Sequence, residues 1–345
     1  MSRPAERLVG ERVNGCWTVV ERLEKKVGES GGNFSTGYIV EKDDGVKGFL
    51  KAIDFLVDPN EADPARKLQE LTAAFNFERD ILSACRNARL RRVAIAIDDG
   101  RLVLPDTGEV VQFLIFELAD GNLHHRVLFD ENFELAWALR VAHNVASGLW
   151  QVHKEKIAHL DLKPSNVLYY VADGSKIADF GRSSRLGTPV FQHERLTVAG
   201  DLTYAPPELL YGYVHPEWFV RRIGCDMYLL GSLVVHLISG VGLTQQILSR
   251  LPVGYSFNEW PYGYEAIKPH ISDLVDAILN DALSNAHPTI RGDLQSVLDE
   301  LCNVEPEKRG KPGLGRPLAV QFSLQRYISI FDRLAKKSEL FLRNK

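Results

Sequence analysis

The stretch from His159 to Tyr170, HLDLKPSNVLYY, and the stretch from Lys176 to Ser184, KIADFGRSS, hold the most informative group of polar side chains in the sequence. The first places a carboxylate, an ammonium and an amide within six residues, at Asp161, Lys163 and Asn166. A second carboxylate, Asp179, follows eighteen residues after the first. Such a set suits phosphoryl transfer, in which a protein holds Mg²⁺, offsets growing charge and orients a hydroxyl.

The composition is that of a folded globular protein. The chain has 345 residues, of which 45% are hydrophobic and 25% are charged, which excludes a disordered or low-complexity chain. The formal net charge of −4 offers no broad positive surface for a nucleic acid or an anionic membrane. We therefore expect neither as a partner.

The cysteines and the N-terminus indicate a cytoplasmic protein. Cys16, Cys85, Cys225 and Cys302 have no short spacing, so neither a disulfide framework nor a CxxC metal site is encoded. The N-terminal residues lack the apolar run of a secretory signal. The longest apolar run, Met227 to Leu243, is shorter than a membrane span and contains His236, so we expect a buried core helix.

The chain divides into a sheet-rich part and a helical part. Residues 15–118 alternate β-rich runs with turn signals, which predicts an antiparallel meander. One helix interrupts it, because Asp63 and Pro64 are typical of a helix start and apolar residues follow at helical spacing, at Leu68, Leu71, Phe75, Leu82 and Cys85. Long helical patterns follow Asp120.

HLDLKPSN with DFG resembles the catalytic and metal-binding loops of eukaryotic-type protein kinases, and the resemblance extends over residues 14–310. It implies an α+β, bilobal protein-kinase-like fold, with a small β-rich N-lobe that holds one main helix and a larger helical C-lobe. The expected divisions are an N-terminal extension (1–13), the N-lobe (14–118), the C-lobe (119–313) and a C-terminal helical extension (314–345).

The resemblance implies the roles of the polar group. Asp161 would accept the proton of the substrate hydroxyl, and Lys163 would offset charge on the γ-phosphate. Asn166 and Asp179 would hold the metal ions. The implied cofactors are ATP and Mg²⁺ or Mn²⁺, and the implied partner is a protein substrate.

The resemblance also implies a nucleotide site. Lys51 in FLKAID would grip the α- and β-phosphates, paired with Glu78 of FERDIL, while Glu70 is the weaker rival. In FLIFELADGNL, Phe116 would be the gatekeeper, and the backbone of Glu117 and Ala119 would face the adenine edge. Leu168 would form the floor beneath the base.

Four further residues are expected to be structural. Glu208 of TYAPPELL should form a buried ion pair with Arg309, and Asp226 should tie down the backbone of the catalytic loop. His159 is expected to be a packed core histidine and not a general base.

The phosphate loop departs most from the family pattern. Gly32 is retained, but Ser30 and Ser35 stand where the first and third glycines are expected, and Gly37 stands in place of valine. Phe49 occupies the position of a small alanine above the adenine. We expect this ring to narrow the nucleotide pocket.

Two further departures lie around the catalytic loop. Leu160 replaces the arginine of the common HRD sequence, so we expect no regulation through an activation-loop phosphate at that residue. The activation loop carries four hydroxyl residues, Ser183, Ser184, Thr188 and Thr197. Their replacement by alanine is then expected to change activity by only a few fold. Asp201 stands where Ser/Thr kinases carry a threonine, and its carboxylate could compete for Lys163.

Three functions compete. Lys163, two residues after Asp161, is typical of Ser/Thr kinases, so the leading hypothesis is a Ser/Thr protein kinase. A pseudokinase scaffold is the alternative that the altered glycine-rich loop, Phe49 and Asp201 favour. A small-molecule phosphotransferase ranks third, because those enzymes usually lack DFG, the lysine after the catalytic aspartate and an APE-like segment.

The last segment has the pattern of a basic amphipathic helix. Its apolar residues fall at helical spacing, at Leu324, Tyr327, Phe331 and Leu334. Two interpretations stay open here: a helix docked on its own C-lobe, or a helix that binds a partner.

Overall fold

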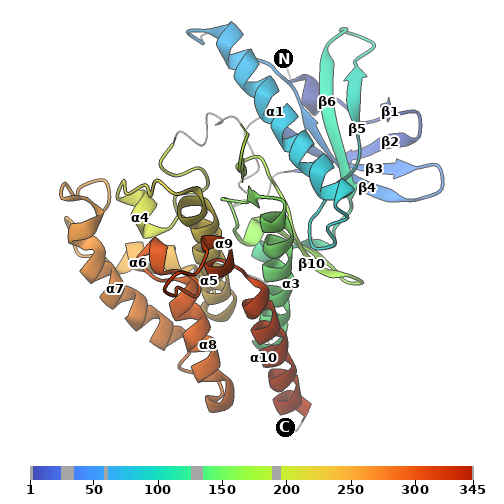
Figure 1. Cartoon of the computed structure of the whole chain (residues 1–345). Helices are drawn as coiled ribbons and strands as arrows, with labels where there is room; N and C mark the ends of the chain where they lie inside the picture. Colours follow the sequence, from blue (N-terminus) through green and yellow to red (C-terminus); the bar gives the residue numbers. More distant parts are fainter. Residues whose placement is uncertain (1–2, 25–34, 58–60, 126–134, 189–195, 344–345) are drawn as a thin grey trace. The chain divides into compact units, whose positions relative to one another are not determined.

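The computed structural model describes residues 3–24, 35–57, 61–125, 135–188 and 196–343. The chain forms two compact units, Met1–Asp120 and Gly121–Lys345 (Figure 1). The first is rich in strands and the second in helices, as the sequence predicts. Gly32 and Ser30 of the predicted phosphate loop lie outside the described residues.

A six-stranded antiparallel sheet with the order β1-β2-β3-β4-β6-β5 forms most of the first unit. Its strands are β1 (Arg12–Val13), β2 (Trp17–Arg22), β3 (Ser35–Lys42), β4 (Lys47–Ile53), β5 (Ala96–Val103) and β6 (Val110–Glu117). The predicted meander is confirmed from β1 to β4 only. After β4 the chain forms helix α1 and returns to the sheet as β5, which lies at the edge. Strand β6 then lies between β5 and β4 and pairs with both.

Helix α1 (Pro64–Asn87) starts where the sequence predicts. The Asp63 side chain accepts a hydrogen bond of 3.0 Å from the backbone N–H of Arg66, and Pro64 occupies the first turn, where its missing N–H costs nothing. The predicted apolar stripe is buried only from Phe75 onward, at Phe75, Leu82 and Cys85. Leu68 is 43% exposed.

The N-terminal residues pack into the first unit. The 3-10 helix η1 (Pro4–Glu6) and the residues after it place Ala5 and Leu8 in one cluster with Tyr38. The Tyr38 hydroxyl donates to the Ala5 carbonyl at 2.7 Å, and the buried Asp54 carboxylate accepts the Ala5 N–H at 3.1 Å. The described part of residues 1–13, predicted as an extension, is therefore part of this core.

In its described residues, the second unit consists of helices and three short pairings of strands. Its strands are β7 (Gly121–Asn122), β8 (Ile157–Ala158), β9 (Val167–Tyr170), β10 (Gly174–Ile177) and β11 (Ser184–Arg185), ordered β10-β9-β7 and β11-β8. Its helices are α3 (Leu135–Lys154), η2 (Pro164–Asn166), α4 (Pro207–Leu210), η4 (Phe219–Ile223), α5 (Gly224–Ser239), α6 (Leu243–Arg250), α7 (Gly263–Ala282), α8 (Pro288–Leu301), η5 (Pro306–Lys308), α9 (Leu318–Gln321) and α10 (Gln325–Arg343).

Helix α5 is the buried centre of the second unit. With the π-helical turn η4 it forms one segment, Phe219–Ser239, that is long and apolar enough to cross a membrane. The most apolar 18 residues of this segment are 89% buried inside the protein. The buried core helix predicted for Met227–Leu243 is confirmed as far as Ser239, and its last part is wrong, because the chain turns there and Leu243 begins α6. Gly240 ends α5 with φ = +79°, a conformation that glycine adopts without strain.

Helix α10 docks on α3 (Figure 1). The predicted apolar residues are buried: Leu324, Tyr327, Phe331 and Leu334. Arg140 of α3 makes ion pairs with Asp332 and Glu339 of α10 at 2.7 and 2.8 Å. The docked interpretation of this helix is therefore confirmed, because its apolar face is covered by its own unit.

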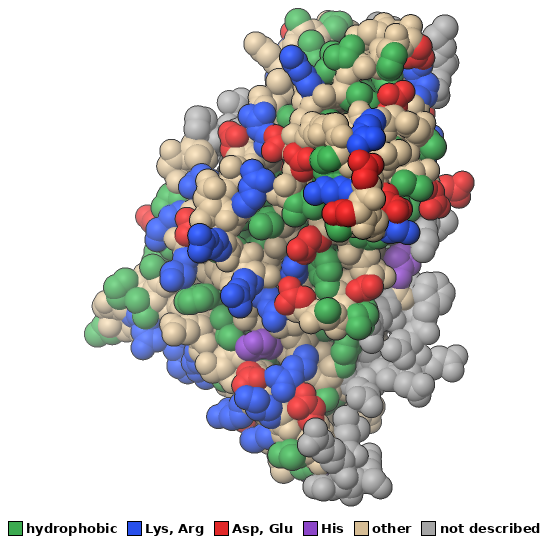
Figure 2. All heavy atoms as spheres, turned by 90° about the vertical axis from the view of Figure 1, so that its right-hand side faces the viewer, with side chains coloured by type: hydrophobic (Ala, Val, Ile, Leu, Met, Phe, Trp, Pro, Cys, Tyr) green, Lys and Arg blue, Asp and Glu red, His purple; other side chains and the backbone are tan. Residues whose placement is uncertain are grey.

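The basic side chains of α10 have acidic neighbours. Arg333 lies 3.1 Å from Asp293, and Lys336 lies 2.7 Å from Asp332 of the same helix. On the face drawn in Figure 2, Lys and Arg side chains are likewise interspersed with Asp and Glu side chains. The positive charge of the segment is thus partly compensated locally.

Candidate active site

The predicted ion pair between Lys51 and Glu78 is present in the first unit. The Lys51 ammonium on β4 lies 2.7 and 3.0 Å from the two carboxylate oxygens of Glu78 on α1. The Glu78 side chain is 8% exposed and that of Lys51 is 20% exposed. Glu70, the weaker rival, pairs with Arg66 on an exposed turn of the same helix.

The catalytic loop lies between β8 and η2 and is anchored by Asp226. This fully buried carboxylate at the start of α5 accepts the backbone N–H groups of His159 and Leu160 at 2.7 and 2.8 Å. Leu160 has φ = +65°, a left-handed conformation that costs free energy for a residue with a Cβ. The two charge-assisted hydrogen bonds oppose that cost, and the predicted role of Asp226 is confirmed.

His159 is a packed core residue, as predicted. Its Nδ1 accepts the Asp161 N–H at 3.3 Å, and its Nε2 donates to the Ala178 carbonyl at 3.0 Å. The ring is fully buried and lies 4.9 Å from the Phe180 ring, centre to centre. With both nitrogens engaged, this imidazole joins the catalytic loop to the DFG segment.

Asp161, Lys163 and Asn166 come together as predicted. The Lys163 ammonium lies 3.2 Å from Asp161 Oδ2, and Asn166 Nδ2 donates to the same oxygen at 3.1 Å and to the Asp161 carbonyl at 2.8 Å. All three residues are at most 8% exposed. The carboxylate is thus held in one orientation by a cation and an amide.

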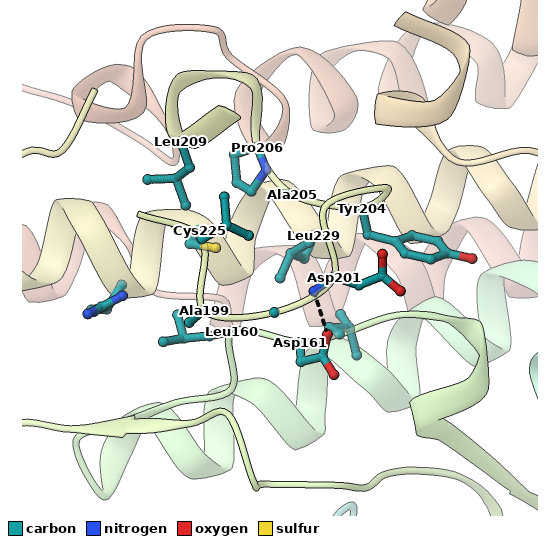
Figure 3. A pocket seen from close by; sticks show the side chains of 14 residues that line it. Leu160, Asp161, Ala199, Asp201, Tyr204, Ala205, Pro206, Leu209, Cys225 and Leu229 are labelled. Carbon is teal, nitrogen blue, oxygen red and sulfur yellow. Dashed lines mark hydrogen bonds between the residues drawn. The ribbon is translucent and has the colours of Figure 1, made fainter. Parts of the chain in front are cut away.

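Asp201 closes the other side of this carboxylate. Its backbone N–H donates to Asp161 Oδ1 at 3.0 Å, drawn as the dashed line in Figure 3, and its carboxylate lies 3.4 Å from Lys163. Thr203 donates two hydrogen bonds to the Asp201 side chain, from its N–H at 3.0 Å and its hydroxyl at 2.8 Å. Lys163 is therefore shared between two carboxylates, as the sequence suggested.

The two carboxylates have opposite pKa shifts. Burial raises the pKa of Asp161 above its ordinary value, although the charge of Lys163 acts to lower it. Burial acts in the same sense on Asp201, but the hydrogen bonds from Thr203 and the charge of Lys163 outweigh it and lower the pKa of Asp201. Of the two, Asp161 is the better proton acceptor.

Gly200 is a site residue that the sequence reasoning missed. A Cβ at this position would lie 2.8 Å from Asp161 Oδ1 and closer still to the Leu160 carbonyl. Only glycine lets the backbone come near enough for the Asp201 N–H to reach Asp161. The signal available in the sequence was the dipeptide Gly200-Asp201 ahead of TYAPPE.

Leu160 faces a small apolar pocket beside Asp161 (Figure 3). Ala199, Leu209, Cys225 and Leu229 are among its lining side chains. Leu160, which replaces the HRD arginine, is only 4% exposed, and these apolar side chains line the pocket beside it.

The donor set predicted for the metal suits Mg²⁺ chemically. Asp179, with φ = +65°, follows β10, and the neighbouring Ala178 N–H donates to the Asn166 carbonyl at 2.9 Å, which ties the two segments together. The side-chain nitrogen Nδ2 of Asn166 donates to Asp161. The side-chain oxygen Oδ1 is therefore directed away from Asp161. Carboxylate and amide oxygens are ligands that Mg²⁺ accepts, with phosphate oxygens completing the shell.

Within the described parts of the chain, no group of three His, Cys, Asp or Glu residues could by itself hold a metal ion.

The remaining predicted residues are placed on separate elements. Phe116 and Glu117 end β6, and Ala119 follows within the first unit. Leu168 lies on β9 of the second unit, opposite Asn122 and Lys176.

The expected scaffold ion pair is present. Arg309 donates to both carboxylate oxygens of Glu208, at 2.6 and 2.7 Å, and its guanidinium is fully buried. Although burial alone acts to lower it, the Glu208 charge and hydrogen bonds raise the pKa of Arg309. The pair joins α4 to the segment after η5.

Comparisons with known proteins match most of this chain. A family profile described as protein kinase domain matches residues 60–313. The chain is similar to the Aurora kinase of Debaryomyces hansenii, 33% identical over 129 residues, which cover 37% of this chain and 30% of that protein. It is also similar to the serine/threonine-protein kinase par-4 of Caenorhabditis briggsae, 28% identical over 242 residues (66% and 35%).

A third relative is the cell division control protein 2 homolog 3 of Trypanosoma brucei brucei, 28% identical over 204 residues (57% of this chain, 64% of that protein). The matched region spans less than two thirds of each of these three relatives.

Proposed function

Since the chain belongs to the protein kinase family, we propose that it transfers the γ-phosphate of ATP to Ser or Thr hydroxyls of a protein substrate. The observation that carries the proposal is the arrangement of Asp161, Lys163 and Asn166, in which one buried carboxylate is oriented by a cation and an amide. This is the arrangement that a transfer based on positioning and charge stabilisation requires.

Asp161 accepts the proton of the attacking hydroxyl in this proposal. Its raised pKa keeps it a better base than an ordinary carboxylate, and the Asp201 N–H holds one of its oxygens in place. Lys163 offsets negative charge on the phosphoryl group during transfer. Asn166 and Asp179 hold Mg²⁺, which supplies charge neutralisation at the phosphates.

The nucleotide is held by the residues predicted from the family. Lys51, fixed by Glu78, binds phosphate oxygens. The backbone of Glu117 and Ala119 reads the adenine edge, and Leu168 packs beneath the base. Phe116, 9% exposed, limits the depth of that site.

A pseudokinase is the second candidate, and the observation that favours it is the position of Lys163 between Asp161 and Asp201. A lysine paired with two carboxylates has less net positive charge to offer a phosphate.

The two candidates differ in whether label is transferred. Full-length protein is incubated with γ-labelled ATP, Mg²⁺ and casein, and the phosphoamino acids are identified. We expect phosphoserine or phosphothreonine, and a large loss of label for Lys51→Ala but not for Lys47→Ala, a 57% exposed lysine of the same strand. Bound ATP without label transfer would establish the pseudokinase, and phosphotyrosine alone would overturn the Ser/Thr assignment.

A further inference from the structure

A tight turn of the second unit fixes Asp201 at both its main chain and its side chain. The carbonyl oxygen of Asp201 accepts the backbone N–H groups of Tyr204 and Ala205 at 3.1 and 3.0 Å. Its side-chain oxygen Oδ1 accepts the N–H of Thr203 at 3.0 Å and the Thr203 hydroxyl at 2.8 Å. The residues that follow Asp201 therefore decide how its carboxylate is oriented.

The two oxygens of the Asp201 carboxylate have different partners. Oδ1 accepts both hydrogen bonds from Thr203, whereas Oδ2 lies 3.4 Å from the Lys163 ammonium. The terminal torsion of an aspartate is broad unless its oxygens are held, and the planar carboxylate turns as one body. The hydrogen bonds at Oδ1 thus also determine where Oδ2 lies relative to Lys163.

The hydroxyl is the part of this turn that belongs to the Thr203 side chain alone. Its backbone N–H would reach Asp201 Oδ1 from any residue except proline. Thr203 is exposed, so its side chain buries little apolar surface. A substitution at position 203 can therefore remove one hydrogen bond to Asp201 and leave the turn in place.

Polar contacts continue from Asp201 to the catalytic carboxylate. The Lys163 ammonium lies 3.4 Å from Asp201 Oδ2 and 3.2 Å from Asp161 Oδ2. Lys163 and Asp161 are buried, so the interactions of these charges are screened less than they would be on the surface. The place of the Asp201 charge therefore affects how much positive charge Lys163 can offer to another group.

We propose that the Thr203 hydroxyl is a positioning group, which holds the Asp201 carboxylate against Lys163 and thereby restrains phosphoryl transfer. The inference rests on the proposed function, because it takes Lys163 to offset charge on the phosphoryl group. Where the family carries a threonine this chain has Asp201, and a threonine two residues later fixes the carboxylate that replaces it.

Loss of the hydroxyl acts on the transfer step and not on nucleotide binding. The Asp201 carboxylate can then turn toward solvent, and more of the Lys163 charge is available when negative charge grows on the phosphoryl group. Turnover rises, whereas the KM for ATP stays unchanged because Lys51 is not touched. Serine at position 203 keeps the hydroxyl and the restraint.

Steady-state kinetics on full-length protein with Mg²⁺, γ-labelled ATP and casein test this role. Thr203→Val and Thr203→Ala are both expected to raise kcat about threefold, with the KM for ATP within about twofold of wild type. Thr203→Ser is expected to stay within about 1.5-fold of the wild-type kcat. Thermal melts of each variant check that the fold is retained.

Thr107→Val is the matched control. Thr107 is an exposed threonine of the first unit, and its hydroxyl likewise bonds to a residue two positions away, accepting the Glu109 N–H at 3.4 Å. This variant removes a similar turn contact far from the Asp201 carboxylate in sequence, and we expect kcat and the KM for ATP to equal those of the wild type.

A double-mutant cycle asks whether Thr203 acts through the Asp201 charge. In the Asp201→Asn background the charge that the hydroxyl positions is absent, so Thr203→Val is expected to change kcat by less than about 1.5-fold. A merely structural role of Thr203 would change kcat by the same factor in both backgrounds.

Three results would overturn the inference. The first is an unchanged or lower kcat in Thr203→Val and Thr203→Ala, the second is a serine variant that behaves like the valine variant, and the third is an equal effect in both backgrounds of the cycle. If the wild type transfers no label from ATP, the proposed function itself fails. Transfer by the wild type that is insensitive to position 203 defeats only this inference.

Discussion

Asp201 is the residue at which this chain differs most clearly from its family within the catalytic group. Its backbone N–H orients Asp161, while its carboxylate competes with Asp161 for Lys163. The first contact is made by the backbone and is kept by any residue except proline, but the second depends on the charge of the side chain. A substitution of the Asp201 side chain can therefore test the effect of its charge on the rate while the orientation of Asp161 is kept.

Removal of the Asp201 charge is expected to raise turnover. Asp201→Asn keeps the backbone contact and frees Lys163 from one carboxylate, so we expect a rise in kcat of about fivefold, equivalent to roughly 1 kcal/mol. Steady-state kinetics measure it, with Asp173→Asn as control, because Asp173 is also paired with a lysine but is 55% exposed. A fall in kcat would make the carboxylate a required positioning group.

Loop hydroxyls are expected to matter little as phosphorylation sites. Ser183 and Ser184 are buried and hydrogen-bonded, Ser183 to the Phe180 carbonyl and Ser184 to the Trp218 indole, so alanine there would lower stability. The test is therefore confined to Thr188 and Thr197. Because Leu160 lies in an apolar pocket, the double alanine variant should retain activity within a few fold, and a collapse of turnover would contradict this.

At the scale of the element, α5 carries a buried histidine whose charge state sets a pH dependence. His236 is 7% exposed, and among the described atoms its Nδ1 has no hydrogen-bond partner. Burial, with a smaller contribution from His124, lowers its pKa to about 4. In the unfolded chain the same imidazole takes up a proton near pH 6.5.

Acid should therefore destabilise the fold through His236. Between pH 6.5 and pH 4 the unfolded state binds more protons than the folded state, so the free energy of unfolding falls as pH falls through this window. The loss from this group is about 2 kcal/mol at pH 4.5. Urea unfolding at pH 7 and 4.5 should show a smaller loss in His236→Leu than in the wild type, and equal losses would contradict the assignment.

Helix α10 should stabilise the second unit through one face only. Phe331 is fully buried and Leu340 of the same helix is 57% exposed. Phe331→Ala is expected to lower the free energy of unfolding by about 3 kcal/mol, and Leu340→Ala by less than about 0.5 kcal/mol. Chemical denaturation measures both, and equal small effects would show that the docked face contributes little.

For the whole molecule, local signals predicted the elements better than they predicted contacts between distant segments. Asp63 and Pro64 define a helix start by chemistry that acts within one turn, so this boundary followed from sequence. The pair Lys51–Glu78 and the Asp226 anchor followed from the order of family motifs. The burial of Ala5 could not be predicted from the sequence, because the helix that contains it, Pro4–Glu6, is too short to show a periodic pattern.

Close approaches were also beyond the sequence. Gly200 is needed because a Cβ at this position would overlap the Leu160 carbonyl and the Asp161 carboxylate. These groups come close to position 200 only in the folded chain. The contact between Phe49 and Gly37 is of the same kind, since a Cβ on Gly37 would lie 2.8 Å from Cε2 of the Phe49 ring. The order of β5 and β6 required the sheet itself.

The function proposed for the whole molecule depends on Asp161 as the proton acceptor, and Asp161→Asn tests it most directly. Transfer of γ-label from ATP to casein is measured beside ATP affinity, with Asp106→Asn, a 67% exposed aspartate, as control. We expect turnover to fall by about 10³-fold in Asp161→Asn, with ATP affinity within a few fold of wild type and the control unchanged. Wild-type turnover in Asp161→Asn would contradict the proposed mechanism.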